Sequence, residues 1–196
     1  MLNTGNILSY LLILPILGAF ILFLIPKWNF QLLRITALFF SFSTFILSLF
    51  LWVWFDKSTS QFQYVDQLFW VPSLNLNFTV GLDGISLFLI ILTTLLIPLC
   101  ILASWVGIKN NVKEYLIAFL IMESFLIGVF CILDLLIFYV LFESVLIPMF
   151  LIIGIWGSRE RKIRAAYFFF FIHSFRFCSN VSRCSLHILR NWNYRL

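Results

Sequence analysis

The chain is a series of long apolar runs separated by short polar segments. An apolar run of about 18 residues or more is long enough to cross a hydrocarbon core as an α-helix. The pattern predicts five membrane spans, near residues 7–25, 32–55, 85–106, 115–133 and 135–155, and a sixth candidate that begins near Ile163. We therefore expect an all-α fold, a polytopic bundle of transmembrane helices. Residues 1–167 form this transmembrane region, and residues 168–196 form a basic tail of different character.

The longest polar segment, residues 56–84, carries further local signals. Within it SLNLNFTV alternates apolar and polar residues with a period of two, which predicts a short strand over residues 74–80 at the membrane surface. Asp83 directly precedes the third span and Asp134 the fifth. A carboxylate at the start of a helix meets the positive end of the helix dipole, so we expect both residues to cap these helices.

The composition agrees with a membrane protein. Hydrophobic residues make up 63% of the chain and charged residues 11%, with a mean hydropathy of +1.07. Ordinary soluble domains hold about a quarter charged residues, so a soluble domain is excluded. The net charge of +5 does not indicate nucleic-acid binding, because the basic residues occupy short segments between spans.

Basic residues gather in alternate loops, which predicts the orientation of the chain. One set of loops holds Lys27, Arg34, Lys109, Lys113, Arg159, Arg161, Lys162 and Arg164, and the other set holds Lys57. Loops rich in Lys and Arg remain on the inner side of a membrane. The amino terminus and the segment 56–84 are then expected outside. The first apolar run follows MLNTGN, which has no positive segment, so a secretory signal is not indicated.

Two carboxylates are the candidate functional groups. If spans four and five form an antiparallel pair that turns near residue 133, Glu123 and Glu143 each lie about ten residues from the turn, or ~15 Å deep at 1.5 Å per residue. Neither has a basic residue within four positions. Burying an ionised carboxylate in the membrane is costly, and two like charges disfavour each other. We expect at least one of them to bind and release protons, as a proton relay does.

Pro148 lies in the same span as Glu143 and is expected to disturb the helix beside it. A proline cannot donate to the carbonyl four residues earlier, which here belongs to Ser144. An unpaired carbonyl is tolerated at membrane depth where protein groups or water satisfy it. Glu143, Ser144 and Pro148 therefore indicate a hydrated, protein-lined position. The structural alternative is that Glu123 or Glu143 is a permanently protonated hydrogen-bond donor that holds helices together.

Several of these segments resemble the chain 4 family of NADH-ubiquinone oxidoreductases, most closely its plant mitochondrial form. The resemblance rests on FTVGLDGISLFLIILTTLLIPLCILASW, LIMESF, CILDLLIFYVLFESVLIPMFLIIGIWG and RKIRAAY, and covers roughly residues 1–167. It implies the amino-terminal part of an antiporter-like fold, in a proton-pumping subunit of respiratory complex I. The family's FE-x-x-L-x-P-M pattern gives Glu143 the role of the essential proton-path carboxyl, and its acidic residue in span four, here Glu123, is also implicated.

The resemblance carries further expectations. It implies the mitochondrial inner membrane, the matrix as the inner side, an amino terminus toward the intermembrane space, and other membrane-arm subunits of complex I as partners. NADH and ubiquinone serve the whole complex, and no cofactor or metal site is expected on this chain, which lacks a Gly-rich dinucleotide motif and cluster-type cysteine spacing. The alternatives are a sodium/proton antiporter subunit, a non-transporting membrane scaffold and an inactive fragment.

Two features depart from the family. The chain ends before the span-seven lysine that the family pairs with its span-five glutamate, so we expect a truncated amino-terminal portion. The tail FIHSFRFCSNVSRCSLHILRNWNYRL repeats arginine where the family has an apolar span. A shift of the reading frame by one base would allow an apolar translation there, which makes a frameshift our hypothesis for residues 168–196. Cys178, Cys184 and His187 match no strong zinc pattern.

Overall fold

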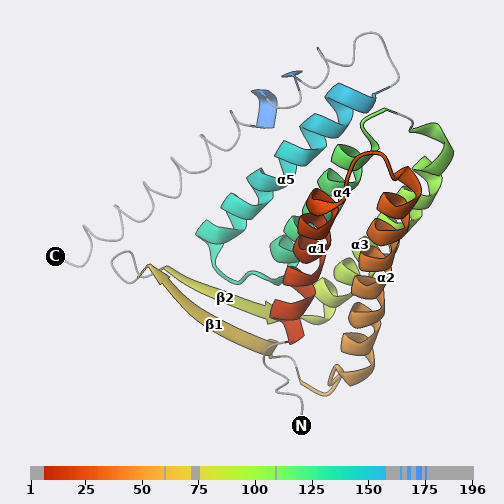
Figure 1. Cartoon of the computed structure of the whole chain (residues 1–196). Helices are drawn as coiled ribbons and strands as arrows, with labels where there is room; N and C mark the ends of the chain where they lie inside the picture. Colours follow the sequence, from red (N-terminus) through yellow and green to blue (C-terminus); the bar gives the residue numbers. More distant parts are fainter. Residues whose placement is uncertain are drawn as a thin grey trace. The chain divides into compact units, whose positions relative to one another are not determined.

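The computed structural model describes residues 7–157 except 60, 72–75 and 109, together with residues 164, 167, 168, 171–173 and 175. Its named elements are five helices and two strands (Figure 1). In chain order they are α1 (Ile7–Leu24), α2 (Phe30–Trp54), β1 (Gln63–Val71), β2 (Leu76–Leu82), α3 (Gly84–Gly107), α4 (Val112–Cys131) and α5 (Leu135–Trp156).

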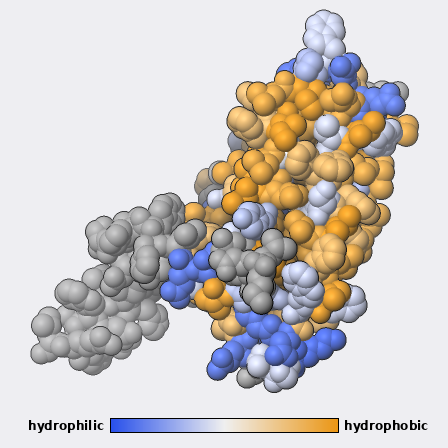
Figure 2. Space-filling model, turned by 60° about the horizontal axis from the view of Figure 1, so that its bottom comes forward, coloured by the Kyte–Doolittle hydropathy of each residue, from blue (hydrophilic) through white to orange (hydrophobic). Residues whose placement is uncertain are grey.

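All five helices are long and apolar enough to cross a membrane, which confirms the five predicted spans. Many large apolar side chains point away from the bundle, among them Phe20 on α1, Phe39 on α2 and Phe88 on α3, each more than 60% exposed. Figure 2 shows a broad hydrophobic surface between more hydrophilic ends. Such a surface is expected where the surrounding solvent is lipid or another apolar chain.

The polar segment between α2 and α3 forms an antiparallel hairpin of β1 and β2. The strand predicted over residues 74–80 corresponds to β2, whereas β1 was not predicted. The backbone N–H of Leu133 donates to the carbonyl of Thr79 at 2.9 Å, and Ile132 forms an isolated bridge with Val80. The turn between α4 and α5 is therefore hydrogen-bonded to β2, and β2 provides partners for the backbone groups of the turn.

Aspartates begin two of the helices, as predicted. Asp83 caps α3 in a reciprocal capping box with Ser86, whose hydroxyl accepts from the Asp83 backbone N–H at 2.8 Å. Asp134 Oδ1 accepts from the backbone N–H groups of Leu136 at 2.8 Å and Ile137 at 3.4 Å, in the first turn of α5. These bonds satisfy N–H groups that have no partner within their own helix.

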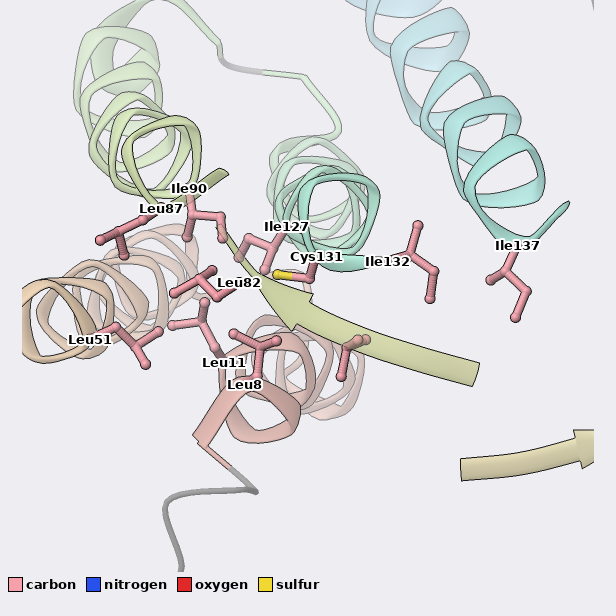
Figure 3. Close-up of a cluster of buried hydrophobic side chains, with 11 residues drawn as sticks. Leu8, Leu11, Leu51, Leu82, Leu87, Ile90, Ile127, Cys131, Ile132 and Ile137 are labelled. Atoms are coloured by element: carbon pink, nitrogen blue, oxygen red, sulfur yellow. The ribbon is translucent and has the colours of Figure 1, made fainter. Parts of the chain in front are cut away.

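An apolar core lies where the hairpin meets the helices (Figure 3). It draws side chains from all five helices and from β2: Leu8, Leu11, Leu51, Val80, Leu82, Leu87, Ile90, Ile127, Cys131, Ile132 and Ile137. Cys131 is a buried free thiol in this core and Cys100 is a free thiol on the surface. A buried free cysteine behaves here as a small hydrophobic residue.

The chain divides into two compact units, residues 1–148 and 149–196. In the second unit, the rings of Phe150 and Tyr167 meet edge to face with centroids 5.8 Å apart. Residues 164, 167, 168, 171–173 and 175 are helical. The rest of the expected sixth span, the tail arginines, and Cys178, Cys184 and His187 lie outside the described residues.

Candidate functional site

Glu123 is the most deeply buried acidic side chain in the described chain, with no solvent exposure. It lies on α4, whose buried face also carries Leu120 and Ile127. Thr44 of α2 is equally buried, and its hydroxyl Oγ1 lies 2.5 Å from Glu123 Oε1. Within the described residues the second carboxyl oxygen, Oε2, has no hydrogen-bond partner. The bundle thus encloses a carboxyl group with one hydrogen-bonded oxygen and one buried oxygen that has no partner among the described residues.

Thr44 belongs to a row of small polar residues on one face of α2. Ser41, Thr44 and Ser48 follow one another at spacings of three and four residues, and none has any exposed surface. This spacing places all three on the same side of a helix. The hydroxyl of Ser48 lies 2.9 Å from that of Thr94 on α3, so the row continues on to α3. Sequence reasoning missed this row, although its spacing was visible in SFSTFILS.

A second polar contact fixes the position of α4. Ser124, the residue after Glu123, donates from its hydroxyl to the backbone carbonyl of Leu12 on α1 at 2.9 Å. α4 is therefore hydrogen-bonded to α2 through Glu123 and to α1 through Ser124. These bonds orient the face of α4 that carries the carboxyl.

Glu143, the other candidate, lies on α5 and is only partly buried. Glu123 and Glu143 each lie eight residues from the helix end that borders the turn at residues 132–134. The similar membrane depth expected for the two carboxyls remains a prediction. The two sites nevertheless differ, because Glu123 is enclosed by packed helices, whereas the α5 residues with buried side chains are Ile137, Leu146 and Pro148.

The proline in α5 does not end the helix, which continues through Pro148 to Trp156. Pro148 is buried, and the hydroxyl of Ser144 donates to the carbonyl of Val140 at 2.8 Å. The hydroxyl thus bonds one turn toward the start of the helix. The predicted hydrated break beside Glu143 remains a prediction.

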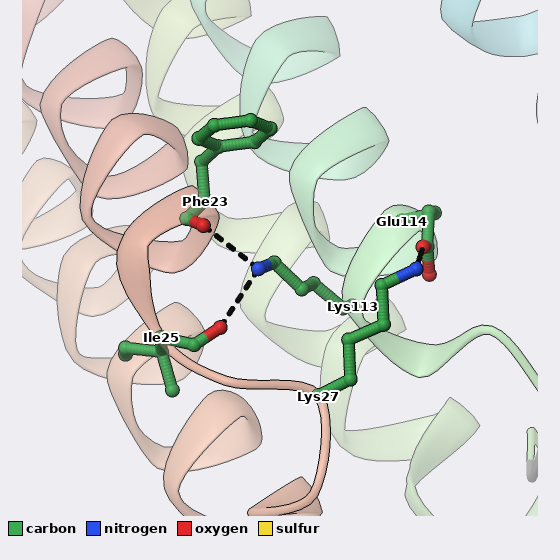
Figure 4. A network of polar contacts seen from close by, with 5 residues as sticks. All are labelled: Phe23, Ile25, Lys27, Lys113 and Glu114. Atoms are coloured by element: carbon green, nitrogen blue, oxygen red, sulfur yellow. Dashed lines mark hydrogen bonds and ion pairs between the residues drawn. The ribbon is translucent and has the colours of Figure 1, made fainter.

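The α1–α2 and α3–α4 loops lie at the end of the bundle opposite the hairpin (Figure 1), and basic residues from both meet there (Figure 4). Lys113 donates to the carbonyls of Phe23 and Ile25, each at 2.7 Å, and Lys27 pairs with Glu114. These contacts join the α1–α2 loop to the start of α4. They place basic residues from two alternate loops at the same end, as the loop pattern predicted.

Arg34 adds a contact at this end by donating to the carbonyl of Ile108 at 2.8 Å. A pocket of about 500 Å³ lies between the loops, lined by Lys27, Phe30, Asn110, Asn111, Val112, Lys113 and Glu114. Among the described residues, no three His, Cys, Asp or Glu side chains gather as metal ligands would.

Comparison with known proteins gives this arrangement a family. Residues 7–133 match the family described as NADH-ubiquinone oxidoreductase chain 4, amino terminus. The chain belongs to the NADH-ubiquinone oxidoreductase chain 4 family. The match includes Thr44, Glu123 and the whole hairpin. Residues 132–179, which include Glu143, match a second family, described as the transmembrane region of NADH:quinone oxidoreductase/Mrp antiporter proteins.

Curated members of the chain 4 family are close in sequence. The chain is 59% identical to NADH-ubiquinone oxidoreductase chain 4 of Arabidopsis thaliana over 163 residues, and 57% identical to that of Marchantia polymorpha over the same length. Each match covers 83% of this chain and 33% of the relative. The chain thus spans about a third of the length of the chain 4 proteins it matches.

The fold also matches a solved structure. A chain of respiratory complex I from Thermus thermophilus with bound NADH superimposes with a TM-score of 0.67 at 27% identity. The match covers 82% of this chain and 31% of that one. The arrangement of spans in this chain 4 family member is therefore that of a subunit in a respiratory complex I structure.

Proposed function

We propose that this chain forms the amino-terminal part of a membrane-arm subunit of NADH:ubiquinone oxidoreductase and takes part in proton translocation. Its family, its five spans and its likeness to a chain of a complex I structure support the proposal. The observation that carries the proton-relay role is the enclosed Glu123, which has a hydroxyl partner on a neighbouring helix and an open second oxygen. Ionisable groups within membrane spans are costly, and they mark proton and ion paths.

In this proposal Glu123 and Glu143 bind and release protons within the membrane. A carboxylate that takes up a proton loses its charge. The neutral acid is less costly to bury than the charged carboxylate, so each proton uptake or release changes the free energy of burying that side chain. Changes elsewhere in the enzyme would bias that equilibrium by altering the surroundings of the carboxyls. NADH and ubiquinone serve the complete enzyme, and we assign neither of them to this chain.

We further propose that the chain lies in the mitochondrial inner membrane with its amino terminus toward the intermembrane space. The end of the bundle that carries Lys27, Arg34 and Lys113 would then face the matrix, as the positive-inside rule requires. The exposed apolar faces of the helices would contact lipid and other membrane-arm subunits.

The test replaces Glu143 and Glu123 by glutamine, singly, in the full-length subunit of the assembled enzyme. Glutamine keeps the shape and hydrogen-bonding capacity of the side chain but cannot release a proton. We expect both variants to assemble and to lose NADH-driven proton translocation. Glu114→Gln is the matched control, because Glu114 is ion-paired on the exposed basic end.

Two outcomes would contradict the proposal. Normal proton translocation in both variants would remove the relay role. Failed assembly with no separate translocation defect would favour a scaffold role, in which the carboxyls only hold helices together.

A second candidate function is cation/proton exchange without electron transfer. The description of the family matched by residues 132–179, which includes Mrp antiporters, favours it. Transport that requires a sodium gradient and continues without NADH would support this candidate. Transport that stops when NADH is withdrawn would support the proposed function.

A further inference from the structure

The contacts of Thr44 indicate whether Glu123 carries a proton. Thr44 Oγ1 lies 2.5 Å from Glu123 Oε1 and 2.7 Å from the backbone carbonyl oxygen of Ser41. Both are hydrogen-bond distances, and all three side chains are without solvent exposure. The threonine hydroxyl therefore contacts two oxygens at once, away from the exposed surface of the bundle.

The number of hydrogens available decides which form of Glu123 fits. A threonine hydroxyl carries one hydrogen, a carbonyl carries none, and an ionised carboxylate carries none. With an ionised Glu123, one hydrogen would have to serve two contacts, and one pair of acceptor oxygens would face each other without a hydrogen. With a proton on Oε1, Glu123 donates to Thr44, and Thr44 donates to Ser41, so both contacts are satisfied.

The open second oxygen agrees with the neutral form. Glu123 Oε2 has no hydrogen-bond partner among the described residues. In the neutral acid with the proton on Oε1, Oε2 is an uncharged carbonyl oxygen. An under-satisfied buried carbonyl is tolerated more readily than an unpaired buried charge.

Among the described residues, no ion pair supplies Glu123 with a positive charge that would replace the proton. α4 packs against α1, α2 and α3. Tyr10 and Cys100 are exposed, and Arg34 bonds to a carbonyl at the basic end. Glu143 of α5 is itself acidic and therefore supplies no positive charge.

We propose that Thr44 is a positioning residue that acts as a two-position hydrogen-bond switch for Glu123. While Glu123 is protonated, its O–H donates to Thr44, and Thr44 donates to the Ser41 carbonyl. When the carboxyl gives its proton to a water molecule, the Thr44 hydrogen rotates and donates to Oε1. This step gives up the hydrogen bond from Thr44 to the Ser41 carbonyl and forms one from Thr44 to Oε1, while no covalent bond of Thr44 breaks. The Ser41 carbonyl remains an acceptor within the backbone of α2. This inference rests on the relay role proposed for Glu123.

The test measures the infrared absorption of the protonated carboxyl in the intact enzyme carrying the full-length subunit. Glu123→Gln identifies the Glu123 carboxyl band by its loss. Thr44→Val keeps the branched shape but removes the hydroxyl, so the band should move to higher frequency as its hydrogen bond is lost. Thr44→Ser restores a hydroxyl and should return the band toward its original position.

Thr94→Val is the matched control. Thr94 is an equally buried threonine, but it bonds to Ser48 and to backbone carbonyls of its own helix. The Glu123 band should not move in this variant. If Thr44→Val does not assemble, Thr44→Ala provides the same loss of the hydroxyl with less bulk.

The outcomes separate this inference from the proposed function. A Glu123 band that stays in place in Thr44→Val, or the absence of any protonated band lost in Glu123→Gln, would overturn the switch. Normal proton translocation in Glu123→Gln, together with a band that depends on Thr44, would overturn the relay role of Glu123 and leave the hydrogen-bond arrangement standing.

Discussion

Ser48 of α2 and Thr94 of α3 share a hydrogen bond of 2.9 Å between hydroxyl groups that have no exposed surface. Ser48 also lies 2.7 Å from the carbonyl of Phe45, and Thr94 lies 2.9 Å from that of Ile90. If Ser48 donates to Phe45, Thr94 can donate to Ser48, and the contact of Thr94 with the Ile90 carbonyl then has no hydrogen of its own. The two hydroxyls thus connect neighbouring helices, and neither of them is a titratable group in the way that Glu123 is.

This bond should contribute measurably to the packing of α2 on α3. Hydrogen bonds between membrane helices contribute on average about 0.6 kcal/mol and at most about 1.7 kcal/mol. We predict a coupling energy in this range for Ser48→Ala and Thr94→Val in a double-mutant cycle of unfolding free energies in mixed detergent micelles. Additive losses would show that the two hydroxyls act independently.

Gly18 marks a close approach of α1 to α2. A Cβ added there would lie 2.7 Å from Cγ and 2.8 Å from Cβ of Phe40. Because the contact involves the root of the Phe40 side chain, a rotation of the ring alone cannot relieve it. We predict that Gly18→Ala lowers the free energy of unfolding by about 1–3 kcal/mol through overpacking, less the about 0.5–1 kcal/mol that alanine gains over glycine in a helix.

Gly107→Ala is the control for this prediction. Gly107 ends α3, and a Cβ there would meet nothing within 4 Å. The unfolding free energy of the Gly107→Ala variant should stay close to that of the unchanged chain. Equal effects of the two substitutions would show that backbone conformation, and not the Phe40 contact, determines the cost at Gly18.

The features predicted correctly from sequence are those that local residues determine. Span length and hydrophobicity are properties of consecutive residues, and the five spans were found for that reason. The caps at Asp83 and Asp134 bond to residues within the next three positions. The period of two in residues 74–80 likewise identified the strand that corresponds to β2.

The features that were missed depend on partners distant in sequence. Span four was expected to begin at Tyr115, but α4 begins at Val112, and Lys113 and Glu114 in its first turn contact the end of α1 and the α1–α2 loop. Glu123 was identified as a candidate, since a carboxylate within an apolar run is visible locally. Its partner Thr44 was not, because it lies 79 residues away. The difference in burial between the two candidate carboxyls also depends on tertiary packing.

Asp56, between α2 and β1, supports a prediction about pH. Its carboxylate accepts from the backbone N–H of Ser58 at 2.9 Å and from the Ser58 hydroxyl at 2.7 Å. These two bonds lower the pKa of Asp56 below its ordinary value of 3.8. Since the pKa is lower in the folded state, the stabilisation is complete above the unfolded value and is lost as the pH falls through the folded one.

We predict that Ser58→Ala raises the pKa of Asp56 part of the way back to 3.8, because the backbone donor remains. The measurement is the carboxyl carbon chemical shift of Asp56 during an acid titration. Ser58→Thr keeps a hydroxyl and should leave the pKa low. A pKa that is the same in Ser58→Ala as in the unchanged chain would show that the hydroxyl has no part in the shift.

Lys113 should hold the end of α1 in place. The last carbonyls of a helix have no partner within it. Here the Lys113 ammonium donates to the carbonyl of Phe23, in the last turn of α1, and to that of Ile25, the residue after Leu24, at 2.7 Å each. Lys113→Met keeps the long apolar stem and removes the donors, so the final turn of α1 should fray. We predict faster amide hydrogen exchange at Phe23, Leu24 and Ile25, with no change in the middle of α1.

Lys113→Gln distinguishes hydrogen bonding from charge at this position, because glutamine keeps two N–H donors but carries no charge. If hydrogen bonding to the carbonyls holds the turn, exchange at these three amides should be slower in Lys113→Gln than in Lys113→Met. Lys27→Met serves as the control, because Lys27 pairs with the Glu114 side chain. Equal exchange rates in Lys113→Met and in the unchanged chain would show that the last turn of α1 is stable without the lysine.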